Sequence, residues 1–329
     1  MNDAGLKKPN HYAPYKTQVA AELKRHLTTE ELRQFHRLSP ARHFAVVTRH
    51  VLLTLLTAVL IWRFPQPWIW LPLAFIQGFH ILGYIILLHE QVHDAIFDRP
   101  HPRVMRLLGL FYAFPSAISA TQFERWHLDH HAELGSASSD PKRAYLTPKI
   151  VARWYKALYL TPALFVIYSI AAAKEARTYP RALQRRIAIE RIVNIALHLA
   201  ILAGLWKWLG PAVALRVHVV PLFFFFPVAF TLNRLGQHYD IDPKDPIKWS
   251  TLVNPSPGWN FLMLWSNLHL EHHYYPRVPF YKLAALNRRL QPFYREHGVQ
   301  PRNYRAILFE WFVKNRAPHT NWFEGPLAE

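Results

Sequence analysis

Four apolar runs of about membrane-spanning length constrain the fold of this chain more than any other feature. The first two cover residues 44–62 and 68–88 and are separated only by RFPQP. The other two cover roughly residues 191–208 and 212–232. A run of about 20 apolar residues crosses a hydrocarbon core of about 30 Å as a helix. The short links predict two tight helical hairpins, each of which returns the chain to its starting side.

The placement of charge predicts which side that is. The sequence has 39 Lys and Arg against 21 Asp and Glu, a net charge of +18, and the two far-side turns hold little of it, chiefly Arg63 and Lys207. By the positive-inside rule the basic segments face the cytoplasm. We expect an integral, multi-pass protein, in a bacterial inner membrane, that binds no nucleic acid.

These observations predict one all-α membrane domain over residues 1–329. Its expected parts are a basic N-terminal arm (1–43), two transmembrane hairpins (about 44–88 and 191–232) and a cytoplasmic helical cap (89–190 and 233–329). Two shorter apolar stretches, 105–120 and 157–173, contain proline and are expected to form interfacial or half-buried helices. The N-terminus lacks an early apolar core, so no cleavable signal peptide is expected.

Histidines cluster where the spans end. The sequence contains HEQVH at 89–93, HLDHH at 127–131 and HLEHH at 269–273, and His238 follows the fourth span. Spacings of three and four residues place such rings on one helix face. Nine neutral rings on one side of the membrane are enough for two metal ions with four or five ligands each. The predicted ligands are His89, His93, His127, His130, His131, His238, His269, His272 and His273.

Other metal-dependent functions fit less well. HEQVH matches the HExxH pattern of zinc proteases, but no third-ligand motif follows it, so an intramembrane zinc protease is a remote alternative. A metal transporter needs ligands spread along the membrane depth, and the candidates His80, His198 and His218 within the spans form no such series. The absence of cysteine excludes disulfides, Cys-type zinc sites and thiolate-held iron–sulfur clusters in this chain. Any electrons must then come from a partner.

In order and spacing, HEQVH, HLDHH and HLEHHYYP resemble the three histidine boxes of the membrane fatty acid desaturase superfamily, over roughly residues 45–290. The resemblance implies a four-helix membrane stalk, two non-haem Fe ions held by eight or nine histidines, and O₂-dependent attack on an unactivated C–H bond. Gln237 departs from a Glu-His pattern common in the family, whereas His238 matches it. The implied partners are a fatty acid or acyl-lipid substrate and a separate electron donor of ferredoxin, rubredoxin or cytochrome b5 type with its reductase.

The boxes do not distinguish the possible outcomes of the reaction. The third box and its flank look most like acyl desaturases, which favours desaturation of an acyl chain. Oxidative decarboxylation of a free fatty acid to a terminal alkene is the nearest alternative. Hydroxylation or ketolation of a lipid or carotenoid is the next alternative after decarboxylation.

Side chains near the boxes could assist. Carboxylates can orient ligand rings, and Asn267 could hold a metal-bound water; these candidates are Glu90, Asp94, Asp129, Asn267 and Glu271. Basic residues could bind a substrate headgroup; these candidates are Arg125, Arg234, Lys248 and Arg277. FFFF at 223–226 could line an apolar substrate tunnel. Because the second and fourth spans end on the same side, we also expect His89 and His238 to share a metal.

Overall fold

The computed structural model describes residues 10–316 apart from 137, 149, 240 and 243. Regular structure in this part of the chain is helical, and the β-bridge recorded there joins Val253 to Arg302. The helices are α1 (Ala13–Lys24), α2 (Thr29–His36), α3 (Pro40–Arg63), α4 (Pro67–Val92), α5 (Pro102–Ala113), α6 (Ala120–Ala132), α7 (Arg153–Leu158), α8 (Ala163–Ala176), α9 (Arg181–Leu209), α10 (Pro211–Ala214), α11 (Phe226–Leu235), α12 (Pro257–Leu262), α13 (His269–Tyr274), α14 (Phe280–Arg289), α15 (Gln291–Glu296) and α16 (Tyr304–Leu308).

The first predicted hairpin is present as α3 and α4. The Ser39 side chain caps α3, Pro40 occupies its first turn, and a short link leads to Pro67 at the start of α4. Proline suits the first turn of a helix because the N–H that it lacks would have no intrahelical partner there. The two helices differ in their surroundings: α3 leaves Leu52 60% exposed, whereas α4 is buried along nearly all of its last four turns. An exposed apolar face of this kind fits lipid, and α4 forms the centre of the bundle.

The second hairpin consists of α9 and a fourth span over Pro211–Leu235. α9 starts at Arg181, ten residues before the predicted start at 191, because its first turns are too polar for a hydropathy pattern. The fourth span combines α10 and α11 with π-helical turns at Leu215–Val219 and Pro221–Phe225. Prolines remove backbone donors and disturb the regular α-helical ladder. Together with the first hairpin, this confirms the predicted four spans.

A glycine allows the two hairpins to approach each other closely. A Cβ atom built on Gly78 of α4 would lie 2.6 Å from the backbone carbon of Phe225 in the fourth span. A real side chain could not occupy that space. Small residues permit such close backbone approach between membrane helices.

Short helices connect the spans to the cap. The helix after α5 ends at Ala117, which has a φ of 56°, and the chain bends by 96° into α6. The two short helices expected at 105–120 and 157–173 are found as α5 and α8 with shifted bounds. Their position at the membrane interface stays a prediction. The bend points α6 under the end of α4.

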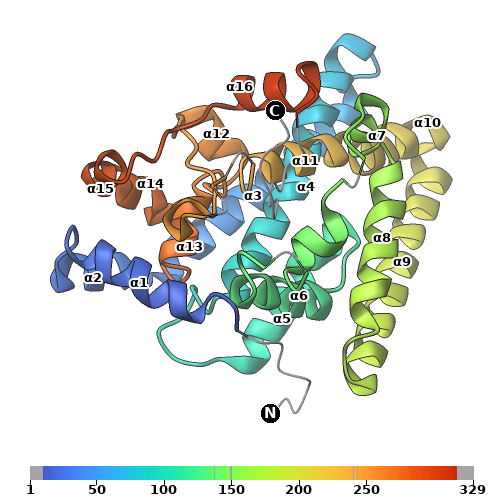
Figure 1. Ribbon diagram of the computed structural model, residues 1–329. Helices are drawn as coiled ribbons and strands as arrows, with labels where there is room; N and C mark the ends of the chain where they lie inside the picture. The colour runs from blue at the N-terminus through green and yellow to red at the C-terminus, as the bar shows by residue number, and fades with distance from the viewer. Residues whose placement is uncertain (1–9, 137, 149, 240, 243, 317–329) are drawn as a thin grey trace.

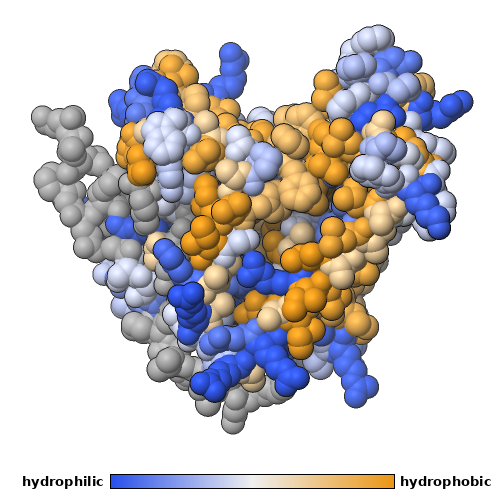
Figure 2. Space-filling model, turned by 90° about the vertical axis from the view of Figure 1, so that its right-hand side faces the viewer, coloured by the Kyte–Doolittle hydropathy of each residue, from blue (hydrophilic) through white to orange (hydrophobic). Residues whose placement is uncertain are grey.

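The arrangement leaves one flank apolar. In Figure 1, α8 and α9 lie on one flank, α1, α14 and α15 lie on the opposite flank, and α4 lies between them. Figure 2 shows the α8–α9 flank, where apolar side chains gather across the middle and hydrophilic ones lie along the lower edge. Near the far-side turns, Trp68 and Trp208 are 75% and 77% exposed. Tryptophan is enriched at membrane–water interfaces, so this distribution fits an embedded bundle.

Candidate metal centre

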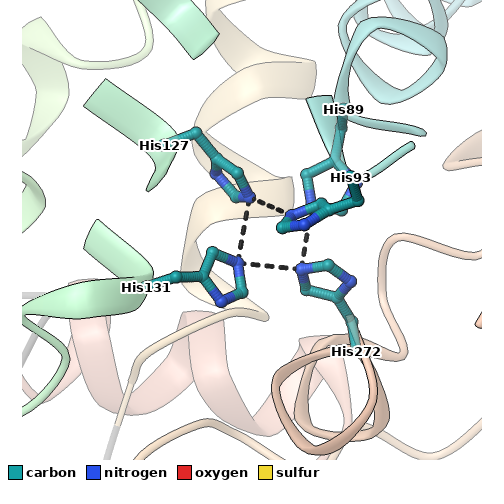
Figure 3. A group of neighbouring side chains, drawn as sticks. All are labelled: His89, His93, His127, His131 and His272. Atoms are coloured by element: carbon teal, nitrogen blue, oxygen red, sulfur yellow. Dashed lines mark hydrogen bonds between the residues drawn. The ribbon is translucent and has the colours of Figure 1, made fainter. Parts of the chain in front are cut away.

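Three helices and one turn bring the nine predicted histidines together. His89 lies in the last turn of α4 and His93 directly follows it, α6 carries His127, His130 and His131, α13 carries His269, His272 and His273, and His238 follows α11. The rings form two groups, in each of which the nitrogens lie within 4.8 Å of one another. The five-histidine group is His89, His93, His127, His131 and His272 (Figure 3). The four-histidine group is His130, His238, His269 and His273.

Helical spacing explains the division. On α6, His127 and His131 are four residues apart and turn into the five-histidine group, while His130 between them serves the four-histidine group. On α13, His272 belongs to the five-histidine group, whereas His269 and His273 belong to the four-histidine group. Two helices therefore each contribute to both groups, which places the groups next to each other.

One sequence expectation about these rings is wrong. His238 does not join His89; its Nε2 lies 3.1 Å from that of His130 and 3.2 Å from that of His269. The Nε2 of His89 instead lies 3.0 Å from that of His272. The ends of two spans can reach the same side without facing each other, because α6 and α13 insert their own rings at both places.

The distances between rings match ligation of one ion per group. In the five-histidine group, neighbouring Nε2 atoms are 2.8–3.0 Å apart (Figure 3). In the four-histidine group they are 3.1–3.2 Å apart. Nitrogens about 2.0–2.1 Å from an ion lie about 3.0 Å apart at right angles and about 3.3–3.4 Å apart in a tetrahedron. Both sets of spacings therefore fit ligand nitrogens that converge on a single ion.

The tautomers in the four-histidine group support the same reading. Nδ1 of His238 lies 2.9 Å from the carbonyl oxygen of Trp249, which can only accept, so this nitrogen carries the ring proton. Nδ1 of His130 lies 2.9 Å from Asp140 and donates to its carboxylate. Both Nε2 atoms then present lone pairs to each other at 3.1 Å. Two facing lone pairs repel unless a cation lies between them, so these residues fit a metal.

Burial keeps the rings in the form that binds metal. It lowers the pKa of His269, His272 and His273 well below the ordinary value for histidine, so these rings are neutral near pH 7. Metal ligation requires the neutral imidazole. Burial also raises the pKa of Asp140 to about 7, and a cation bound through His130 would favour the charged carboxylate.

Two of the candidate carboxylates support the ligand helices. Glu90 lies 3.5 Å from Nδ1 of His89 and accepts a hydrogen bond from the backbone N–H of Phe280. Glu271 is fully buried and accepts from the Tyr294 hydroxyl at 2.7 Å and from Asn287. Glu90 thus joins a ligand ring to α14, and Glu271 anchors α13 to α14 and α15.

The structure places two other carboxylate candidates differently. Asp129 accepts from Arg125 at 3.2 Å. Asp94 is exposed on a turn with a φ of 51° and lines a separate depression together with Arg277. Asn267 is buried, and its Oδ1 has no hydrogen-bond partner among the described residues, so it can accept from a bound water.

Sequence reasoning missed the residues that hold the four-histidine group. Asp140 lies in the loop after α6, and the carbonyl of Trp249 lies in the segment after His238. The N-terminal arm supports both places: the Tyr12 N–H donates to the carbonyl of Ala132 at 2.9 Å, and the Tyr15 ring contacts Trp249 with 4.8 Å between centroids. Loop contacts of this kind carry no fixed sequence spacing, so no motif could have signalled them.

The rings open onto an apolar channel. A first cavity is lined by His89, His127 and His269. It shares Ile85, Phe123, Tyr168 and Phe230 with a second cavity that extends toward Leu164 and Arg191. Of the FFFF segment, Phe226 lines the second cavity, while Phe224 is 50% exposed. The two cavities thus lie between the histidines and the flank of α8 and α9.

One of the four basic headgroup candidates lines this channel. Arg234 is buried in the first cavity together with Lys142, Asn233 and Gln237. Arg125 pairs with Asp129, Lys248 lies 3.1 Å from Asp245, and Arg277 lines the separate depression.

Comparison with known proteins agrees with this geometry. Residues 65–305 match the fatty acid desaturase family model. The chain is 24% identical to a human sphingolipid delta(4)-desaturase/C4-monooxygenase over 236 residues, which is 70% of this chain and 68% of that protein. It is 26% identical over 276 residues to an acyl-lipid 8-desaturase of Rebecca salina, 71% of this chain but only 61% of that protein. Since the family match contains all nine histidines and most of the sequence, the chain belongs to the fatty acid desaturase family and is a membrane oxidoreductase.

Proposed function

We propose that the two histidine groups hold two non-haem iron ions and that the protein desaturates a fatty acyl chain with O₂. The observation that carries the proposal is the convergence of nine buried rings, in two adjacent groups, on the wall of an apolar channel. Bound iron would supply the reduction of O₂ and the oxidant for an unactivated C–H bond. Overall, –CH₂–CH₂– with O₂, two electrons and two protons gives –CH=CH– and two waters.

The chain's own residues bind and orient the substrate. Ile85, Phe123 and Phe230 line both cavities, so an acyl chain along them is surrounded by apolar side chains and water is excluded. Such exclusion protects a reactive site from side reactions. Glu90 and Asp140 fix ring orientation on the two groups, and Asn267 offers an acceptor to a bound water.

Hydroxylation is the second outcome that the relatives favour. The human relative is named both a desaturase and a monooxygenase, and the two reactions differ in whether a second hydrogen is removed or oxygen is retained. We place desaturation first because acyl desaturation is the activity that the sequence motifs resemble most. Decarboxylation and ketolation are tested by the same product analysis.

Electrons would come from a separate protein of ferredoxin, rubredoxin or cytochrome b5 type with its reductase. The sequence has no cysteine for a redox site of its own. We propose that the histidine groups face the cytoplasm, where such donors act, because the far-side turns carry little charge. A bacterial inner membrane stays a prediction, and the relatives named above come from eukaryotes.

The test combines metal analysis with product analysis. Purified protein should hold about two irons per chain. Cells that express it and receive saturated fatty acids of several lengths should yield unsaturated products, measured in both lipid extract and headspace gas. Alanine at His127 or His272 should abolish the product. Stoichiometric zinc with peptide cleavage would refute the proposal in favour of a protease.

A further inference from the structure

The first cavity holds two buried basic side chains beside the histidines. Arg234 is 7% exposed and Lys142 is 9% exposed, and both line the cavity with His89, His127 and His269. No acidic side chain of the described chain is among its lining residues. Buried basic side chains are costly unless they are paired, so a cavity that received only hydrocarbon would leave these two groups in an unfavourable environment.

The pairing inside the protein is incomplete. Nη2 of Arg234 is buried and has no hydrogen-bond partner among the described residues. Asp140 interacts electrostatically with Arg234 and Lys142, but this one carboxylate also accepts from His130 and from the backbone N–H of Lys142. Burial lowers the pKa of the Lys142 ammonium well below its ordinary value, whereas a guanidinium keeps its charge. Arg234 is therefore a buried cation with a donor nitrogen that lacks an acceptor oxygen within the described chain.

The size and polarity of the channel indicate what that anion is. The first cavity has a volume of about 60 Å³, and a water needs about 10–15 Å³ on the same measure, so it has room for a carboxylate. The second cavity, which shares Ile85, Phe123, Tyr168 and Phe230 with it, is lined mainly by apolar side chains, among them Ile118, Leu164 and Phe226. The polar end and the apolar end match the two ends of a fatty acid.

We infer that the substrate is a free long-chain fatty acid bound carboxylate-first, with Arg234 as the anchor and Lys142 as a neighbouring hydrogen-bond donor. The guanidinium is suited to this task because its planar N–H groups match a carboxylate. The inference rests on the proposed function and adds the substrate class. It also restricts the position of oxidation: because the anchor and three ligand rings line one cavity, the carbons next to the carboxylate lie beside the rings.

The alternative orientation has its own anchor. Arg191 lines the second cavity at the α9 flank, and a carboxylate there would send the tail toward the histidines. Arg191 is half-buried on a helix that faces outward, so its charge can be hydrated without a ligand. Arg234 is buried, so its charge cannot be hydrated in the same way, and we therefore assign the carboxylate to Arg234.

Binding of tritiated palmitate and methyl palmitate to the iron-loaded protein in detergent tests the anchor without requiring turnover. The two probes share a chain and differ in charge. We expect palmitate to bind at least about tenfold more tightly, as expected for a hydrogen bond to a charged group. Arg234→Gln should remove this preference and Arg234→Lys should keep part of it. The matched control Arg277→Gln, in the separate depression, should keep all of it.

Several results would overturn the inference. Equal binding of the two probes to the unaltered protein removes the need for a carboxylate anchor, even if Arg234→Gln does not fold. Loss of the preference in Arg191→Gln, but not in Arg234→Gln, reverses the orientation. Palmitate deuterated at carbons 2 to 4 should lose label on turnover, whereas loss from carbons 9 and 10 contradicts carboxylate-first binding. If no lipid is oxidised at all, the proposed function fails, and the binding comparison still decides whether Arg234 is the anchor.

Discussion

Replacing Asp140 tests whether the four-histidine group is a metal site. The Asp140 carboxylate accepts from Nδ1 of His130 with oxygens at 2.9 and 3.0 Å. Asparagine preserves the shape and one acceptor oxygen but removes the charge. A hydrogen bond to a charged group contributes about 1.5–3 kcal/mol and a neutral one about 1 kcal/mol. The difference, about 0.5–2 kcal/mol, predicts a loss of affinity of about twofold to thirtyfold for one of two irons. Asp140→Ala should lose up to about a hundredfold.

The assay is competition for iron against a chelator of known affinity, with bound iron counted per chain and turnover measured on the same samples. Asp129→Asn is the matched control, because Asp129 is also a buried carboxylate close to the histidines but pairs with Arg125. It should change iron affinity by no more than about twofold. If folded Asp140→Ala binds both irons as tightly as the unaltered protein, or if Asp129→Asn loses as much, the assignment of Asp140 as the residue that orients His130 is wrong.

Two further predictions concern the ligand outside the boxes and the topology. His238→Gln should insert normally, bind about one iron fewer and lose nearly all turnover, as measured by metal analysis and product formation. His36→Gln, on α2, is the control. Full iron with full activity in His238→Gln would exclude His238 as a ligand. Because the chain has no cysteine, single introduced cysteines can report sidedness with an impermeant thiol reagent. Those at the exposed positions 65 and 209 should be labelled from one side of the membrane and those at 138 and 288 from the other; labelling of 138 and 288 from opposite sides would contradict a shared site.

The sequence predicted the spans well where hydropathy decides and less well where tertiary contacts do. α3 and α4 match the expected runs because lipid or core surrounds them throughout. The first turns of α9 were missed because they contain charged residues, among them Glu190, which the structure pairs with Arg106, Ser119 and Thr121. Those contacts attach α9 to α6, and a local sequence pattern cannot predict a contact with a residue about 70 positions away.

The histidines were predictable because ligand spacing is set by the helix itself. Their assignment to two groups was not, since it depends on the rotation of α6 and α13 relative to α4. The same limit applies to Arg234, which was one of four basic candidates until the fold placed it alone among them in the cavity. Chemistry that lies within one helix can be predicted from sequence, whereas chemistry assembled between helices requires the fold.

The N-terminal arm has a practical consequence for work with this protein. Tyr12 and Tyr15 contact the end of α6 and Trp249, the two places that support the four-histidine group. An affinity tag or fusion partner is therefore safest at the opposite terminus or well ahead of residue 10. Trimming by a protease beyond Tyr12 would remove a brace of the metal site while leaving every histidine in place. A preparation purified by a C-terminal tag can thus be inactive because its N-terminal arm has been trimmed, and the gene sequence would not reveal this loss.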